Sequence, residues 1–279
     1  MPLALVPTPI GCLEDITLRA LRVLREADLI ACEDGRTSSV LLRHHGVSAP
    51  LVPFHLHNEN DVLPRLLAAL RKGKRVVVIS DAGTPGISDP GWILLRRAID
   101  EGLDVDVLPG PSAILPALLL SGLAPHPFLF HGFPPEKKGE RERLFRALAP
   151  LSCTLCFYVS PHKVVAQTEE MIEAWGARRC ALVREISKIY QEAIRGTLPD
   201  VVARARAGLK GEMVLVVEGR PDDGPSDDAW MIETEALLDA GGSVRDIAAD
   251  VSARYGVARN AVKAHLLGLR RVDGGGGAS

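Results

Sequence analysis

Short apolar runs of strand length alternate with helical periodicities over the first part of the chain. The runs, rich in Val, Ile and Leu, lie at 3–6, 29–34, 51–57, 75–79 and 105–108. The intervening segments space their apolar residues three and four positions apart, as one buried helix face requires, at 16–26, 38–45, 60–71 and 92–101. We expect Asp15 to cap the first helix. Residues 1–115 thus predict an α/β domain with a parallel sheet.

The pattern changes after the Pro-Gly-Pro-Ser segment at 109–112, where another helix should begin. Apolar strands are predicted at 128–132, 154–159, 180–184, 191–198 and 212–217. These strands indicate a second domain over 116–220 with a mixed sheet.

The C-terminal part reads as a separate helical appendage. A stretch rich in Pro, Gly and Asp at 221–228 predicts a linker, and residues 229–271 should contain helices at 243–255 and 258–269. The glycine-rich tail, 272–279, is expected to be disordered. The apolar positions of the two helices suit a nucleic-acid-binding helix-turn-helix or a packing module, and we favour packing. They are Val244, Ile247, Val251, Val257, Val262 and Leu266.

Two of the predicted strand ends are polar and turn sharply. They read EDGR at 33–36 and SDAGTPGISDPG at 80–91. Ligands bind outside the carboxyl ends of strands in open parallel sheets. Glycines let backbone approach a ligand closely, and prolines hold a loop's shape. The pattern predicts a cradle for an adenine and a ribose, although a pair of structural turns is the simpler alternative.

Several familiar nucleotide and hydrolase motifs are absent. The first strand is followed by PTPIG at 7–11 and not by a glycine-rich dinucleotide fingerprint, and neither a P-loop nor a nucleophile elbow occurs. Of the five cysteines, Cys153 and Cys156 have metal-ligand spacing, but they lie in an apolar run that predicts a strand. Residues three apart on a strand point to opposite faces, so we expect small buried side chains and no metal.

Composition narrows the classes of partner. The 279 residues are 47% hydrophobic with a net charge of −2, which suits a globular protein without a field that attracts nucleic acid. A local basic patch at Lys137, Lys138, Arg141 and Arg143 is the best RNA contact, with a solvated helix start as the alternative. No apolar stretch reaches the length of a membrane span, and the N-terminus lacks a signal pattern, so we expect a cytoplasmic protein.

Three motifs closely resemble the ribosomal RNA small subunit methyltransferase I family. They are VPTPIGCLEDITLRAL at 6–21, SDAGTPGISDPG at 80–91 and LPGPSA at 108–113. The resemblance continues through FHGFPP (130–135), FYVSPH (157–162), REISK (184–188), RGTL (195–198) and GEMVLV (211–216), and so covers almost the whole chain. The chain departs from the family pattern at Gly35, usually Thr, at Leu56, often Glu, and at Val159, usually Glu.

The resemblance implies a two-domain tetrapyrrole-methylase fold, the class III methyltransferase fold, that holds S-adenosylmethionine between its domains. It also implies 2′-O-methylation of a cytidine ribose in 16S rRNA, within the small ribosomal subunit, and a homodimer. The first domain would contribute Pro7, Asp81, Ala82, Gly83, Thr84, Ser112 and Ala113 to the cofactor pocket. The second would contribute Tyr158, Val159 and residues near Glu185.

A ribose hydroxyl must lose its proton during such a transfer, which calls for a general base. The candidates are Glu33, Asp34, His57, Glu59, His162 and Glu185. We favour the Glu33–Asp34–Arg36 group, in which Arg36 binds a phosphate or steadies a carboxylate; equally, Asp34 and Arg36 simply pair at a strand end. RNA would be contacted by Lys137, Lys138, Arg141, Arg143 and Lys163.

Two rival functions stay open. A methyltransferase of the same fold acting on a tetrapyrrole should carry a Gly-x-Gly-Pro-Gly-Asp run after the first strand, where this chain has PTPIG. A non-enzymatic protein that binds ribosomes or RNA would need no cofactor cleft. Fold alone does not separate these possibilities.

Overall fold

The computed structural model describes residues 2–221 and 229–273. The chain divides into two compact units, the first ending at Gly219 and the second beginning at Arg220. Residues 222–228, most of the predicted linker, and 274–279, most of the predicted tail, lie outside the described residues.

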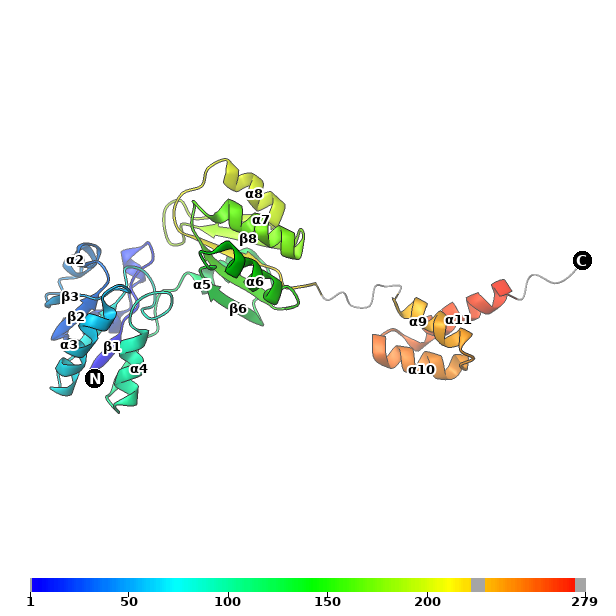
Figure 1. The fold of residues 1–279 in the computed structure, drawn as a ribbon, viewed down its shortest axis with the longest axis horizontal. Coiled ribbons are helices and arrows are strands. Elements are labelled where there is room, and N and C mark those ends of the chain that lie inside the picture. Colours follow the sequence, from blue (N-terminus) through cyan, green and yellow to red (C-terminus); the bar gives the residue numbers. More distant parts are fainter. Residues whose placement is uncertain (1, 222–228, 274–279) are drawn as a thin grey trace, which may run out of the picture. The chain divides into compact units, whose positions relative to one another are not determined.

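The first unit begins with a five-stranded sheet in which every strand is parallel to its neighbours (Figure 1). Its strands are β1 (Leu3–Leu5), β2 (Leu29–Cys32), β3 (Leu51–Pro53), β4 (Val76–Ile79) and β5 (Val105–Val107), in the order β3-β2-β4-β1-β5. This confirms the parallel sheet predicted for the N-terminal part. The strand at 51–57 is shorter than predicted, because the Asn58 side chain accepts a hydrogen bond from the His55 amide and turns the chain.

Helices cover both faces of this sheet. They are α1 (Leu18–Arg25), α2 (Gly35–His44), α3 (Glu59–Arg71) and α4 (Trp92–Asp100). Ala4 of β1 packs with α1 and α2, whereas its neighbours Leu3 and Leu5 pack with α3 and α4, as the alternation of a strand requires. The predicted cap of α1 was wrong: Asp15 lies in a short 3-10 turn, η1 (Leu13–Asp15), and Thr17 accepts the hydrogen bond from the Ala20 amide.

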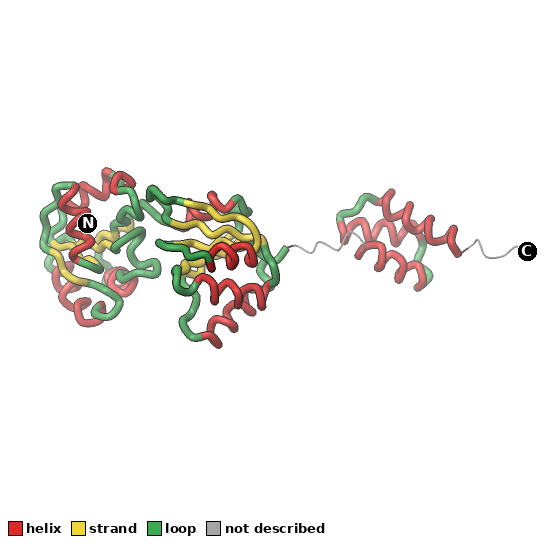
Figure 2. The backbone as a smooth tube through the Cα atoms, turned by 90° about the horizontal axis from the view of Figure 1, so that it is seen from above, coloured by secondary structure: helices red, strands yellow, loops and turns green. Residues whose placement is uncertain are grey.

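The second sheet of this unit is mixed, as predicted. Its strands are β6 (Phe128–Gly132), β7 (Thr154–Val159), β8 (Arg179–Arg184), β9 (Glu192–Thr197) and β10 (Met213–Val217), in the order β6-β7-β10-β8-β9. Only β6 and β7 pair in parallel. Helix α5 (Ile114–Ser121) packs on one face, and α6 (Lys138–Leu148), α7 (Val164–Trp175) and α8 (Leu198–Arg206) pack on the other (Figure 2). We call the parts built on the first and second sheets the N-terminal and C-terminal lobes.

The second unit consists of α9 (Ala229–Asp239), α10 (Val244–Tyr255) and α11 (Arg259–Asp273). Ile247, Val251, Val262 and Leu266 are buried together with Trp230 of α9, and Val244 and Val257 pack against them. The apolar positions seen in the sequence therefore hold three helices together. Residues 272 and 273 belong to α11, and the rest of the predicted tail lies outside the described residues. Among all the described helices, none is long and apolar enough to cross a bilayer.

Candidate active site

Hydrogen bonds connect the loops that follow the central strands of the N-terminal lobe. Thr8, just after β1, and Gly83, in the loop after β4, exchange two backbone hydrogen bonds of 2.9 Å. The Thr8 hydroxyl donates to the Ser80 carbonyl at 2.9 Å, and the Thr84 hydroxyl donates to the Pro111 carbonyl at 3.3 Å. The carboxyl ends of β4, β1 and β5 thus form a fixed rim where a parallel sheet binds its ligands.

The end of β2 is tied to the same rim. The Asp34 amide donates to a carboxylate oxygen of Asp81 at 3.2 Å. The Asp34 side chain caps α2 by accepting from the Arg36 amide at 2.7 Å, and it also pairs with the Arg36 guanidinium at 2.8 Å. These partners lower the pKa of Asp34 to about 2. Its carboxylate therefore stays ionised as the cap of α2 and is a poor acceptor for a proton.

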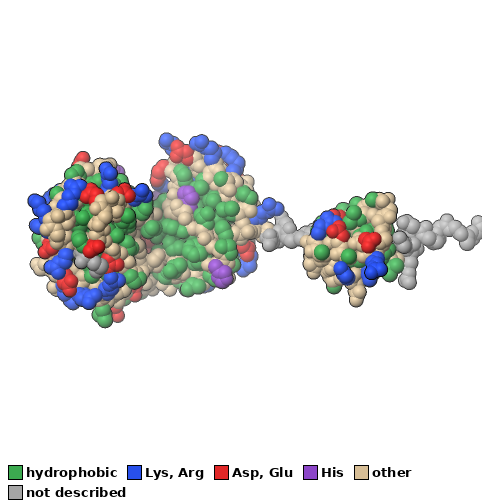
Figure 3. Space-filling model, turned by 90° about the horizontal axis from the view of Figure 1, so that it is seen from below, with side chains coloured by type: hydrophobic (Ala, Val, Ile, Leu, Met, Phe, Trp, Pro, Cys, Tyr) green, Lys and Arg blue, Asp and Glu red, His purple; other side chains and the backbone are tan. Residues whose placement is uncertain are grey.

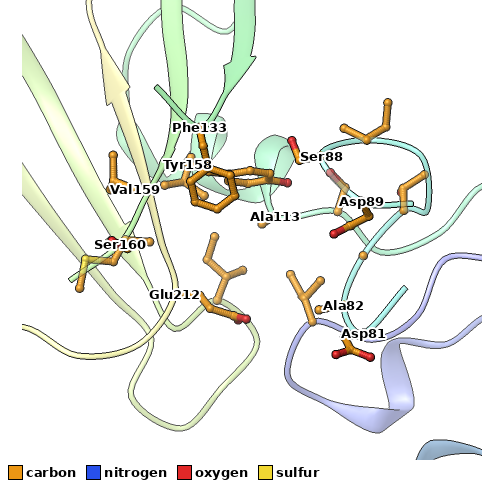
Figure 4. A pocket seen from close by; sticks show the side chains of 18 of the residues that line it. Asp81, Ala82, Ser88, Asp89, Ala113, Phe133, Tyr158, Val159, Ser160 and Glu212 are labelled. Atoms are coloured by element: carbon orange, nitrogen blue, oxygen red, sulfur yellow. The ribbon is translucent and has the colours of Figure 1, made fainter. Parts of the chain in front are cut away.

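A cavity of about 450 Å³ lies against this rim and is closed by the C-terminal lobe. That volume is in the range of small-molecule sites. The lining residues are Ile10, Glu33, Asp81, Ala82, Gly83, Thr84, Ile87, Ser88, Asp89, Ser112, Ala113, Phe133, Tyr158, Val159, Ser160, Pro161, Ile186, Gly211, Glu212, Met213 and Val214. Figure 4 shows the Phe133 and Tyr158 rings on one side of it and Ser88 and Asp89 on the other.

Aromatic rings form the wall supplied by the C-terminal lobe. The Tyr158 ring, at the end of β7, lies 5.2 Å from the Phe133 ring and 5.0 Å from the Phe130 ring, centroid to centroid. Burial raises the pKa of Tyr158 to about 12, with a further contribution from the Asp89 and Glu212 charges. The hydroxyl therefore stays protonated at neutral pH and can donate a hydrogen bond to a ligand.

The turn before β10 is held against the end of β8. Lys188 pairs with Glu185 at 2.9 Å and with Glu212 at 3.0 Å, and a Glu185 oxygen accepts from the Glu212 amide at 3.2 Å. Gly211 has φ +88°, and a Cβ added there would lie 2.1 Å from that Glu185 oxygen. Only glycine fits this position, which places Glu212 at the cavity.

The two lobes touch through backbone at Gly11. A Cβ added to Gly11 would lie 2.8 Å from the Ser187 carbonyl oxygen and 2.9 Å from the Ile186 carbonyl oxygen. The Cγ atom of Lys188 would be closer still, at 2.6 Å, so the loop after β1 packs tightly against the loop after β8 at this point. This contact lies beside the cavity, which Ile10 and Ile186 both line.

The charge of the cavity is one-sided. Four lining residues carry carboxyls, Glu33, Asp81, Asp89 and Glu212, while the lining contains no Lys, Arg or His. Burial, reinforced by the neighbouring acids, raises the pKa of Glu33 and of Asp81. The same causes act most strongly on Asp89 and raise its pKa to about 7. Such a cavity favours a ligand that carries positive charge.

Most of the residues predicted to bind a cofactor do meet at this cavity. Asp81, Ala82, Gly83, Thr84, Ser112, Ala113, Tyr158 and Val159 all line it. Pro7 does not; it packs under the rim, where a Cβ on Gly110 would come within 2.7 Å of the Pro7 Cβ.

The predicted catalytic residues separate into two groups. Glu33 lines the cavity, but Asp34, Arg36 and Glu185 do not, and the other base candidates, His57, Glu59 and His162, also lie outside the lining. The Arg36 side chain is 93% exposed and pairs with Asp34, while Glu185 pairs with Lys188. The geometry agrees with the simpler alternative for Asp34 and Arg36, a pair at a strand end.

The predicted RNA contacts lie on α6 and at the start of α7. Lys137 and Lys138 are exposed at the beginning of α6, and Lys163 precedes α7 and pairs with Glu136. Arg141 is different, because its side chain is only 11% exposed and donates two hydrogen bonds of 2.6 Å to the Glu170 carboxylate. This geometry disfavours Arg141 as an RNA contact. On the face drawn in Figure 3, acidic and basic side chains are interspersed, so an RNA contact must be local.

Sequence reasoning missed several lining residues, chiefly Ser88, Asp89, Phe133, Ser160 and Glu212. Asp89 had a signal, because it belongs to the glycine-rich loop at 80–91. Glu212 belongs to the GEMVLV motif at 211–216, but the sequence presents it only as the start of an apolar strand, and it reaches the cavity through the packing of the two lobes. Within the described residues, no group of three potential metal ligands comes together.

Comparison with known proteins places this site in a family. The sequence model for tetrapyrrole (corrin/porphyrin) methylases matches residues 2–202. A protein of Halalkalibacterium halodurans named ribosomal RNA small subunit methyltransferase I is 43% identical over 229 residues, 82% of this chain and 79% of that protein. A protein of the same name from Mesorhizobium japonicum is 41% identical over 280 residues, which cover 98% of this chain and 94% of that protein. The chain belongs to the ribosomal RNA small subunit methyltransferase I family.

Solved structures agree on the fold of this family member. The uroporphyrin-III C-methyltransferase of Thermus thermophilus superposes with a TM-score of 0.58 at 23% identity, over 77% of this chain and 93% of the other. The tetrapyrrole-methylase fold predicted from the motifs is therefore confirmed. The methyl donor is S-adenosylmethionine, and the cavity suits it: carboxyls for a sulfonium and an aromatic wall for a nucleoside.

Proposed function

We propose that this protein transfers a methyl group from S-adenosylmethionine to the 2′-hydroxyl of a cytidine ribose in 16S rRNA. The observation that carries the proposal is the match, at 41% identity over 98% of the chain, to a relative named for small-subunit rRNA methylation. The position of the cavity supports it. Segments that the family motifs mark, at 81–84, 112–113 and 158–159, line one cavity at the carboxyl ends of parallel strands.

The residues of this cavity can perform the protein's share of the reaction. The sulfonium methyl is already electrophilic, so the protein must align the ribose oxygen with the sulfur–methyl bond and accept the hydroxyl proton. Glu33 is the one acid of the favoured group that lines the cavity, and its raised pKa makes it a better base at neutral pH. Asp89 joins it as a candidate on the same grounds.

We further propose that the small ribosomal subunit is the substrate and that Lys137, Lys138, Arg143 and Lys163 contact its phosphates. Lys163 stands two residues after Pro161, which lines the cavity, so RNA held there would be close to the methyl donor. A homodimer is part of the proposal. Helix α5 supports it, because Leu115 is 56% exposed and Leu119 72% exposed, as suits an interface between copies.

Methyl transfer from radiolabelled S-adenosylmethionine tests the reaction. Small subunits that lack the modification, free rRNA and a tetrapyrrole precursor are offered in parallel, and the labelled nucleoside is identified after digestion. Label in a single 2′-O-methylated cytidine is expected, most strongly with assembled subunits. Label in the tetrapyrrole and none in RNA would overturn the proposal in favour of a small-molecule acceptor.

The same assay separates the catalytic acids. Glu33→Gln and Asp89→Asn should each lower the rate at saturating donor, by about 10²-fold for the true base. Glu14→Gln, on the exposed 3-10 turn η1, serves as the matched control and should leave the rate unchanged. Light scattering of the purified protein tests the homodimer, and a monomer at micromolar concentration would contradict it.

A further inference from the structure

We propose that the carboxyls of the cavity, Asp89 foremost, select the cationic methyl donor over its neutral demethylated product by charge. The inference rests on S-adenosylmethionine as donor, and not on the RNA target proposed above. The two nucleosides share every group but one. Transfer breaks the sulfur–methyl bond, moves the methyl to the acceptor oxygen and leaves the electron pair on sulfur, so the sulfonium charge disappears while the acceptor's proton departs.

The acids of the cavity come from separate segments that the fold brings together. Glu33 follows β2, Asp81 and Asp89 flank the loop after β4, and Glu212 precedes β10. None of the other lining side chains carries a positive charge. A cation that enters therefore meets carboxyls and no basic lining side chain, so the local field favours positive charge.

Three of the four carboxyls already have partners. Asp81 accepts from the Asp34 amide, Glu33 is hydrogen-bonded by the Asp81 backbone, and Glu212 pairs with Lys188 at 3.0 Å. Asp89 makes no hydrogen bond or ion pair with any described residue. It directs its carboxyl toward the open centre of the cavity (Figure 4). Asp89 is thus the charge most available to a ligand.

The charged groups that face Asp89 all disfavour its ionisation. Glu33, Asp81 and Glu212 repel its negative charge, and burial adds the largest effect, so the pKa of Asp89 rises to about 7. Tyr158, across the cavity, stays neutral because its own pKa is raised to about 12. A sulfonium would reverse this balance. Its charge favours ionised Asp89, so donor binding near neutral pH should release a proton, whereas product binding should not.

Binding calorimetry without any RNA tests the inference. The donor, the demethylated product and the analogue with a protonated amine in place of the methyl sulfonium are titrated at about pH 6 and about pH 7.5. From the lower to the higher pH, the affinity for the donor should rise about fourfold relative to the product, as one carboxyl that loses about a unit of pKa on binding requires. The amine analogue should follow the donor. When the titrations are repeated in buffers of different ionisation enthalpy, the measured binding enthalpy should show proton release for the donor and the amine analogue, and none for the product.

Asp89→Asn should remove most of this difference, leaving a relative affinity that changes less than about twofold between the two pH values. Asp104→Asn is the matched control, because Asp104 is exposed in the loop before β5; its pH response should equal that of the wild type. Melting curves followed by circular dichroism show that each variant is folded. Equal pH responses for donor and product in the wild type, or an unchanged response in Asp89→Asn, would overturn the inference. Such a result would leave the proposed RNA target untouched, because the labelling assay measures that separately.

Discussion

The Asp34 amide donates a hydrogen bond to the Asp81 carboxylate across 3.2 Å, and so joins the ends of β2 and β4 at the cavity. Asp81 thus has two roles, as an anchor for the β2 loop and as a negative charge in the lining. Two substitutions of Asp81 separate these roles. Asparagine keeps an acceptor oxygen for the Asp34 amide but loses the charge, whereas alanine loses both.

Asp81→Ala should weaken donor binding about tenfold or more, about 1.4 kcal/mol, because it removes both the anchor and the charge. Asp81→Asn should have only part of this effect, since the Asp34 amide keeps its partner. Calorimetric titration with S-adenosylmethionine measures both. Equal effects of the two substitutions would show that the anchor contributes nothing to binding.

Gly211 offers a test of backbone fit at the turn before β10. Gly211→Ala should destabilise the fold by about 2–4 kcal/mol, because it combines positive-φ strain with a clash against the Glu185 side chain. Gly208→Ala is the matched control: Gly208 has the same φ of +88°, but a Cβ there meets nothing within 4 Å. Chemical denaturation should therefore show a destabilisation of only about 1 kcal/mol for the control. Similar values for the two variants would mean that the Glu185 side chain is irrelevant.

The Arg141–Glu170 pair should stabilise the C-terminal lobe. Both side chains are about nine-tenths buried, and Arg141 also donates to the Pro135 and Glu136 carbonyls at 2.9 Å. Arg141→Ala leaves a buried carboxylate without its partner and should cost about 3–5 kcal/mol of unfolding free energy. Arg143→Ala, on the exposed face of the same helix, should change it by less than about 0.5 kcal/mol. An Arg141 variant as stable as the Arg143 variant would contradict this role.

RNA binding should depend on the exposed basic residues and not on Arg141. Alanine at Lys137, Lys138, Arg143 or Lys163 should weaken binding to small-subunit rRNA. Each substitution that frees one phosphate should also lower the slope of log affinity against log salt by about one. Filter binding over a range of salt concentrations measures this slope. The Asp104→Asn protein is the control and should keep the wild-type slope; slopes that stay unchanged in all four basic variants would move the RNA-binding surface elsewhere.

The contribution of Asp89 to the stability of the protein should fall as the pH rises from about 4 to about 7. The folded-state pKa of Asp89 is raised from 3.8 to about 7, so in this window the folded state binds more protons than the unfolded state. Three units correspond to about 4 kcal/mol, but water reaches part of this side chain, so we expect about 1–2 kcal/mol. Asp89→Asn should therefore be more stable than the wild type at pH 8 and similar at pH 4 in thermal melts. No difference at pH 8 would show that Asp89 titrates normally.

Residues of the N-terminal lobe were predictable because a parallel sheet brings its strand ends to one edge. Glu33 and the loop at 80–91 follow apolar strands that are neighbours in the sheet, and the rule that ligands bind there places them together. Phe133 and Glu212 were not predictable in this way. They reach the cavity through the packing of one lobe on the other, which no local pattern records.

Charge patterns were the weakest guide to individual roles. Within the run at 137–143, acids and bases alternate, and the sequence does not say which side of the helix faces inward. The structure turns Arg141 toward Glu170 and leaves Lys137, Lys138 and Arg143 outside. The cap of α1 failed for a related reason, because Asp15 and Thr17 both have suitable side chains and only the backbone geometry selects Thr17.

The close approach of backbone at Gly11 also bears on how the protein could be altered. The loop after β1 rests directly on the Ile186 and Ser187 carbonyls, with no room for even a methyl group. A residue with a side chain at this position would push the N-terminal and C-terminal lobes further apart. The spacing of the two lobes beside the cavity thus depends on a residue outside the cavity lining, and enlarging that residue is a way to test whether a wider cavity accepts bulkier methyl donors.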